Sequence, residues 1–161
     1  MGMCFQLIAI SPQDIGKLSL GETIEELLDQ HFEAQSDYAL DLYKNWDGVD
    51  FLFHQADQSS LPRNWLTESG DQIGEDLGYG PARVWSTEVV TSIAKKTGLC
   101  EAVSLNAAFD FKLFEQAEVY PNNWDQQDSR DKDIVLSACS HLQRMLRATA
   151  NRRDALLGAL I

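Results

Sequence analysis

Residues 22–36 carry the most restrictive pattern in the chain, an apolar side and an acidic side repeated at the period of an α-helix. The apolar side follows the i, i+3, i+4, i+7, i+8 spacing and consists of Ile24, Leu27, Leu28, His31 and Phe32. The opposite side consists of Glu22, Glu25, Glu26, Asp29 and Glu33. A helix of this kind buries its apolar side and presents its polar side to water. We therefore expect one strongly acidic helix on the surface of the protein.

Residues 37–46 allow two interpretations. In the first, the helix continues to Trp46, and Asp37 and Asp41 extend the row of acids spaced by four from Glu25. A single helix of that length would, however, expose Leu40. In the second, the helix ends near Ser36 and residues 38–42 form a short strand, because alternate residues of a strand share one face.

The remaining pattern predicts an α+β fold. Apolar residues 3–10 and 155–161 are expected to form the first and last strands, and residues 82–85 look extended. Residues 45–55 read as a buried helix with Asp47 as its cap, and residues 56–81, rich in Gly and Pro, as a loop. Further helices are expected at residues 86–96, 110–117 and 131–150. We predict a single compact domain, residues 1–161, with a small, mostly antiparallel sheet that includes the N- and C-terminal strands, packed with about five helices.

The charge of the chain limits its partners. The formal net charge is −12, and residues 22–50 hold nine acids against the single lysine Lys44. Nucleic acid and anionic membrane surfaces attract basic patches, so neither is expected as a partner, whereas a basic protein is. We expect the partner-binding residues to be Glu22, Glu25, Glu26, Asp29, Glu33, Asp37 and Asp41. The N-terminus lacks the features of a signal peptide or membrane span, which predicts a cytoplasmic protein.

No motif for catalysis or cofactor binding stands out. His31-x-Glu33 resembles the start of a zinc deaminase motif, but the Pro-Cys-x-x-Cys that would complete it is missing. The histidines and the cysteines Cys4, Cys100 and Cys139 are too scattered for a zinc motif or a disulfide framework. The glycines of GEDLGYGPAR lack the Lys-Ser/Thr of a phosphate loop. We expect no cofactor and no metal, and an enzyme is not favoured.

Four segments in order resemble the YfbM-like family, a bacterial family known as domain of unknown function 1877. They are the N-terminal MGM, LDLYKNWDGVDFLF (residues 40–53), GYGPARVWSTEVV (78–90) and FDFKLFEQAEVYPNNWD (109–125). The resemblance covers nearly the whole chain and implies a compact α+β fold with no established activity. Where the family commonly carries histidines after the tryptophan, this chain has Asp47 and Asp50, which puts histidine chemistry there in doubt. The two aspartates also add to the negative charge of this region.

These observations support two main functional hypotheses. The first is a non-enzymatic acidic protein-binding module, in its sharpest form an immunity protein that neutralises a basic toxin domain. The second is a small-ligand binder or an uncharacterised enzyme, since Trp and Tyr are favoured anchors in binding sites. Its pocket would be lined by Trp46, Tyr79, Trp85, Tyr120 and Trp124. A homodimeric structural module is a third option, and the oligomeric state does not follow from the sequence.

Overall fold

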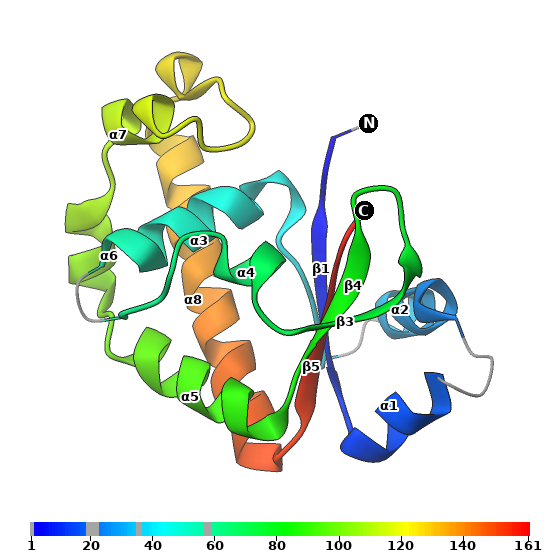
Figure 1. The fold of residues 1–161 in the computed structure, drawn as a ribbon. Helices are drawn as coiled ribbons and strands as arrows, with labels where there is room; N and C mark the ends of the chain where they lie inside the picture. Colours follow the sequence, from blue (N-terminus) through cyan, green and yellow to red (C-terminus); the bar gives the residue numbers. More distant parts are fainter. Residues whose placement is uncertain (1, 19–22, 35–36, 57–58) are drawn as a thin grey trace.

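The computed structural model describes residues 2–18, 23–34, 37–56 and 59–161 (Figure 1). Its strands are β1 (Phe5–Ile10), β2 (Ala39–Asp41), β3 (Asp71–Asp76), β4 (Pro81–Trp85) and β5 (Ala155–Leu160). Its α-helices are α1 (Pro12–Leu18), α2 (Ile24–Glu33), α3 (Trp46–Gln55), α4 (Trp65–Glu68), α5 (Thr87–Gly98), α6 (Ala102–Ala108), α7 (Phe111–Gln116) and α8 (Ser129–Arg152). Short 3-10 helices span η1 (Tyr43–Asn45) and η2 (Trp124–Gln126).

The five strands form one antiparallel sheet in the order β2-β1-β5-β4-β3. The N- and C-terminal strands pair along their whole length at its centre, from Phe5 opposite Leu160 to Ile10 opposite Ala155. Reciprocal backbone hydrogen bonds of 2.8 and 2.9 Å between Cys4 and Ile161 continue this pairing past the strand ends. The predicted α+β class and the terminal strands are thus confirmed.

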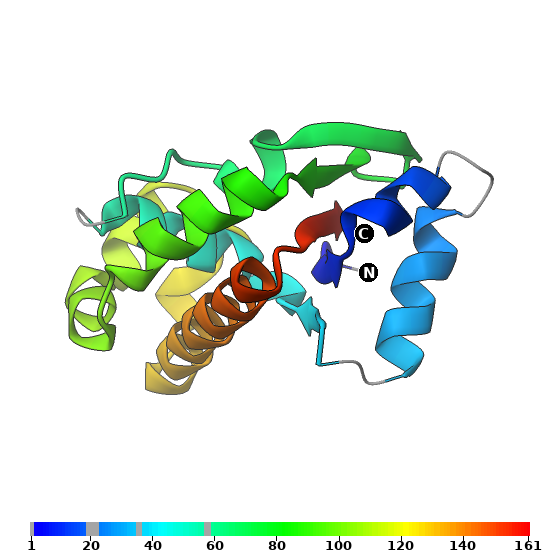
Figure 2. The same ribbon diagram turned by 90° about the horizontal axis from the view of Figure 1, so that it is seen from below.

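Helices cover both faces of the sheet (Figure 2). Along β1, Phe5 and Leu7 belong to the large core formed with α3, α5 and α8, whereas Ile8 and Ile10 belong to a smaller core under α1 and α2. A strand buried on both faces reads as a continuous apolar run, and this is why the two terminal segments were recognisable from sequence.

Residues 37–46 follow the second interpretation. Helix α2 ends at Glu33, and β2 pairs with β1 with Leu40 opposite Leu7. The strand gives the backbone of this segment a partner and lets Leu40 pack against the large core, whereas a continued helix would expose that side chain.

Three predictions for the middle of the chain are wrong or incomplete. Residues 56–81 hold α4 and β3 as well as turns, and α6 was not expected. With α1, the described residues contain eight α-helices, whereas about five were predicted. Strand β3 escaped prediction because it is exposed on both faces and carries one apolar residue, Ile73. Asp47 does not cap α3, because the N-cap is Asn45 and Asp47 lies buried in the first turn.

Candidate functional site

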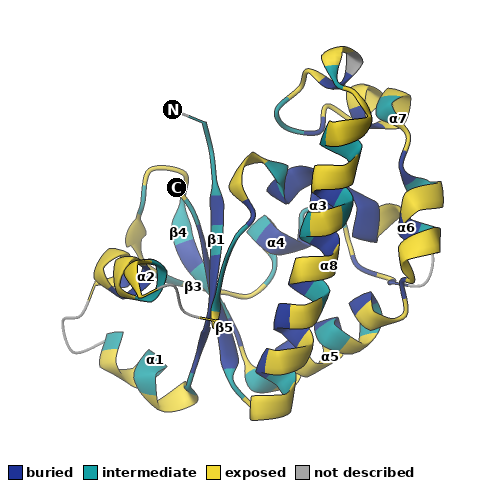
Figure 3. Ribbon diagram, turned by 180° about the vertical axis from the view of Figure 1, so that it is seen from behind, coloured by how far each residue is buried: buried dark blue, intermediate teal, exposed yellow. Residues whose placement is uncertain are grey.

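Helix α2 presents its acidic side to solvent, as its pattern predicts (Figure 3). Glu25, Glu26, Asp29 and Glu33 are exposed on it. The helix begins with a capping box, in which the Thr23 side chain accepts from the Glu26 N–H and the Glu26 side chain accepts from the Thr23 N–H. This cap sets the first turn and therefore the direction of Glu25. Glu22 lies outside the described residues.

The other predicted acids, Asp37 and Asp41, do not lie on this surface. Because the helix ends at Glu33, Asp37 lies instead in the lining of a hollow between β2 and α8, which Arg144 also lines. The Asp41 carboxylate already has two hydrogen-bond donors within the protein. It accepts from the Gln6 side chain at 3.2 Å and from the Tyr43 N–H at 2.6 Å. The predicted partner-binding residues therefore do not share one face.

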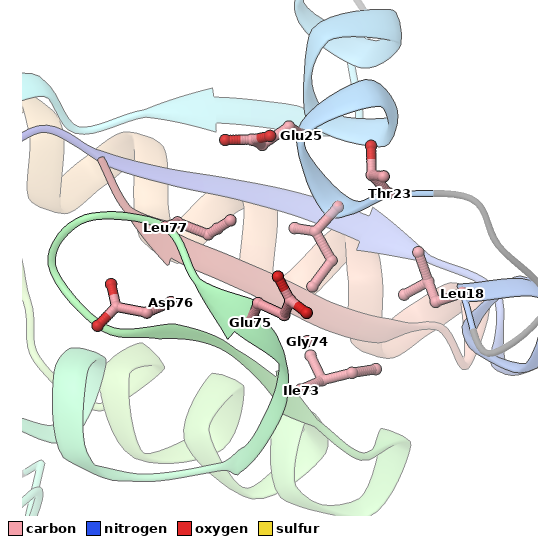
Figure 4. A pocket seen from close by; sticks show the side chains of 9 residues that line it. Leu18, Thr23, Glu25, Ile73, Gly74, Glu75, Asp76 and Leu77 are labelled. Atoms are coloured by element: carbon pink, nitrogen blue, oxygen red, sulfur yellow. The ribbon is translucent and has the colours of Figure 1, made fainter.

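A groove of about 420 Å³ lies between the start of α2 and the β3–β4 hairpin (Figure 4). We call it the acidic groove. It is lined by Leu18, Thr23, Ile24, Glu25, Ile73, Gly74, Glu75, Asp76 and Leu77. Its volume falls in the range of ligand pockets, roughly 300–1,000 Å³. Apolar side chains from α1, α2 and the hairpin line it, and carboxylates from α2 and β3 stand beside them.

The two elements approach closely because position 74 has no side chain. A Cβ atom built on Gly74 would lie 2.6 Å from Cδ1 of Ile24, and the residue has a φ of +75°. Glycine adopts this conformation without the steric penalty that other residues incur. The position also lies at a register shift between Ile73 and Asp76, which bends β3. Gly74 thus determines how closely α2 and β3 can pack.

The three acids of the acidic groove differ in their partners. Asp76 closes the hairpin, since its carboxylate accepts the N–H groups of Gly78 at 2.7 Å and Gly80 at 3.0 Å. These two bonds hold the pKa of Asp76 below its ordinary value. Glu25 and Glu75 form no ion pair with Lys or Arg within the described part of the chain. Their charges are therefore available to a partner.

The five predicted pocket aromatics do not gather around one cavity. Trp46 stacks on Tyr120 with ring centroids 5.9 Å apart, whereas Trp124 packs edge-on against Phe114 at 4.7 Å. The Trp85 indole is buried and donates to the Ser69 hydroxyl at 2.9 Å. Tyr79 lies in the β3–β4 turn and is 50% exposed. Trp124 borders a separate hollow together with Lys112 and Glu115.

Asp47 and Asp50 do not join the acidic surface, contrary to the expectation from sequence. Both are buried on α3 and both bind the guanidinium of Arg63, which lies over the Phe51 ring. The Asp47 carboxylate also accepts the Tyr120 N–H at 2.8 Å. The network ties α3 to two loops that are distant in sequence, and its role is structural. Sequence reasoning missed it because nothing near Arg63 marks it as the partner.

The pKa of Asp50 is raised by burial, although its hydrogen bonds oppose part of that rise. Burial lowers the pKa of Arg63, but the two carboxylates outweigh that effect and leave it raised. We take the ion pair as formed, because Asp50 accepts three hydrogen bonds that a protonated carboxyl could not all retain.

Three further observations concern the described residues. His31 is half-buried at the end of α2 and borders a hollow with Asp14 and Arg152. No three His, Cys, Asp or Glu side chains in the described ranges lie close enough to hold a metal ion. No helix among those ranges combines the length and the apolar character that crossing a membrane requires.

Comparison with known proteins gives a family and a fold. The family model described as "Domain of unknown function (DUF1877)" matches residues 1–158. A crystal structure of YfbM from Escherichia coli, a protein of unknown function, superposes with a TM-score of 0.64 at 15% sequence identity. The match covers 98% of this chain and 99% of that one. At this identity the likeness concerns the fold alone. No curated protein matches the chain.

Proposed function

Because the chain belongs to the DUF1877 family, whose description assigns no activity, we propose a function from the acidic groove: non-enzymatic binding of a basic protein partner. The acidic groove and the adjoining exposed side of α2 form the contact surface. The observation that carries the proposal is the pair Glu25 and Glu75, which stand beside apolar side chains without an ion-pair partner in the described chain.

Charge complementarity is the physical basis of this proposal. Acids arranged on one surface steer a basic protein toward it and raise the association rate, most strongly at low salt. The apolar side chains of the acidic groove supply apolar contact area that a charged surface alone lacks. Such area matters because most binding energy comes from a few side chains that are fully buried in the interface. The sharpest form of the proposal is an immunity protein that neutralises a basic toxin domain in the cytoplasm.

Small-molecule binding or catalysis has less support. It required Trp46, Tyr79, Trp85, Tyr120 and Trp124 to line one pocket, and three of these side chains are buried in packing. The hollow beside Trp124 is a remaining site for a ligand, but it shares only that residue with the predicted set.

Differential capture from native cells tests the proposal. One bait is the wild-type chain, and the second carries Glu25→Lys, Asp29→Lys and Glu33→Lys. A control bait carries Glu101→Lys, Glu118→Lys and Asp133→Lys, which change the charge equally at exposed positions elsewhere. We expect a basic protein that the wild type and the control retain and the α2 variant loses. Its association should slow as salt is added.

A set of captured proteins that the α2 reversal leaves unchanged would refute the proposal. The immunity form makes a separate demand, namely that the reading frame next to the gene encodes a basic, toxic domain. A neighbouring housekeeping gene would count against that form.

A further inference from the structure

The lining of the acidic groove is suited to one kind of side chain, and this inference rests on the proposed function. Leu18, Ile24, Ile73 and Leu77 provide apolar contact, and Glu25 and Glu75 provide negative charge from two different elements (Figure 4). A ligand that matches both must have an aliphatic stem and a cationic end. Lysine and arginine have this form, with a stem that packs on apolar surface while the charge stays near water.

We propose that the partner inserts an arginine side chain into the acidic groove, with its stem against Ile24 and Leu77 and its guanidinium between Glu25 and Glu75. The planar guanidinium has five donors in a fixed arrangement, so it can serve two carboxylates at once. It is also less strongly hydrated than an ammonium group, which lowers the cost of leaving water.

The rest of the lining disfavours other occupants. An anionic ligand would meet Glu25 and Glu75 with like charge. A neutral apolar side chain would fit the apolar lining but would gain nothing from the two carboxylates. The third acid, Asp76, accepts both N–H groups of the hairpin turn through one carboxylate oxygen, Oδ1, and it adds negative potential to the lining. The acidic groove thereby selects a cation through charge and an aliphatic stem through apolar contact.

The probe for this proposal is Nα-acetyl-arginine-methylamide, and its matched control is Nα-acetyl-citrulline-methylamide, which has nearly the same shape but no charge. Titration is followed by the methyl resonances of Ile24, Ile73 and Leu77 in NMR spectra of the full chain. We expect saturable shifts of these methyl groups with the arginine probe, and binding of the citrulline probe weaker by about tenfold or more. That factor corresponds to about 1.4 kcal/mol.

The Glu25→Gln/Glu75→Gln variant should weaken binding of the arginine probe about tenfold, whereas Glu101→Gln, at the exposed N-cap of α6, should leave it unchanged. Both substitutions lie at exposed positions, so circular dichroism should show the wild-type fold. Equal binding of the two probes, or shifts confined to other methyl groups, would overturn the inference.

The two proposals fail in different ways. If the α2 charge reversal removes a basic partner but the arginine probe does not bind the acidic groove, the arginine inference is overturned and the proposed function stands. If the reversal leaves capture unchanged, the proposed function is refuted whatever the probe does.

Discussion

The carboxylate of Asp50 and the guanidinium of Arg63 meet at 2.7 Å, with the aspartate side chain fully buried and the arginine 26% exposed. Asp50 uses both oxygens. One accepts from Arg63 and the Asn64 N–H, and the other accepts from the Leu66 N–H at 3.0 Å. The pair therefore connects α3 to the start of α4, whose first N–H groups have no partner within the helix.

The substitution Asp50→Asn should lower the free energy of unfolding by about 2 kcal/mol, because its amide group would face the Leu66 N–H and leave that donor unsatisfied. Chemical denaturation followed by tryptophan fluorescence measures the change. Glu101→Gln makes the same chemical change at an exposed position and should stay within about 0.5 kcal/mol of the wild type. Equal stability of the two variants would show that Asp50 is not needed as an acceptor.

Removal of the Arg63 guanidinium should lower the free energy of unfolding by more than Asp50→Asn does. Arg63→Met leaves two buried carboxylates without a counter-ion, and breaking a buried pair in this way costs about 3–5 kcal/mol. The loss should depend on pH. A pKa of Asp50 raised in the folded state means that folding takes up a proton. Stability therefore falls as pH rises from the ordinary pKa of an aspartate through the raised pKa. We therefore expect the variant to regain part of its stability near pH 5, and a pH-independent loss would contradict this.

Asp76 should produce the opposite pH dependence. Its pKa is lowered in the folded state, so the unfolded chain binds more protons at low pH. Its contribution is present above the ordinary pKa of an aspartate and is lost as pH falls below about 4. The Asp76→Asn variant should lose stability less steeply than the wild type over that acid range. Thermal unfolding between pH 5 and pH 2.5 tests this, and parallel curves would refute it.

Gly74→Ala should destabilise the protein by about 1–2 kcal/mol, because an L-residue is strained at this positive φ. The added Cβ would also press on the end of the flexible Ile24 side chain and alter the acidic groove. Gly98→Ala is the control, since its Cβ would meet no atom within 4 Å. Alanine favours helices over glycine, so that variant should be as stable as the wild type or more stable by up to about 1 kcal/mol. Unchanged stability of Gly74→Ala would contradict the strain argument.

The thiols should differ in reactivity. Cys100 and Cys139 are buried and Cys4 is half-buried. Burial raises the pKa of all three, and the charge of Cys100 adds to the effect at Cys139. Since the thiolate is the reactive form, a disulfide reagent should modify Cys4 first and the buried pair only on unfolding. Cys4→Ser should abolish the fast phase, and a fast phase that persists would disprove this order.

The sequence by itself determined those elements whose residues repeat at a regular period or that are buried on both faces. Examples are the two-sided pattern of α2, the apolar runs of the terminal strands and the apolar side of α8. In each of them the spacing of apolar residues indicates both the type of element and the side that is buried. The α+β class followed from these, because apolar terminal segments and amphipathic helices have few ways to bury their surfaces together. Residues 38–42 were ambiguous because five residues suit either period.

The tertiary structure alone decided which charges share a surface. Asp41, Asp47 and Asp50 add to the same acidic stretch of sequence, yet the fold turns the first toward a strand neighbour and buries the other two on Arg63. Glu75 and Glu25 line the same groove only because β3 is the edge strand beneath the start of α2. Strand β3 is exposed on both faces, so its sequence lacks the apolar pattern from which a strand is predicted. Long-range pairings of this kind leave no local signal, since the chain brings together residues that are fifty positions apart.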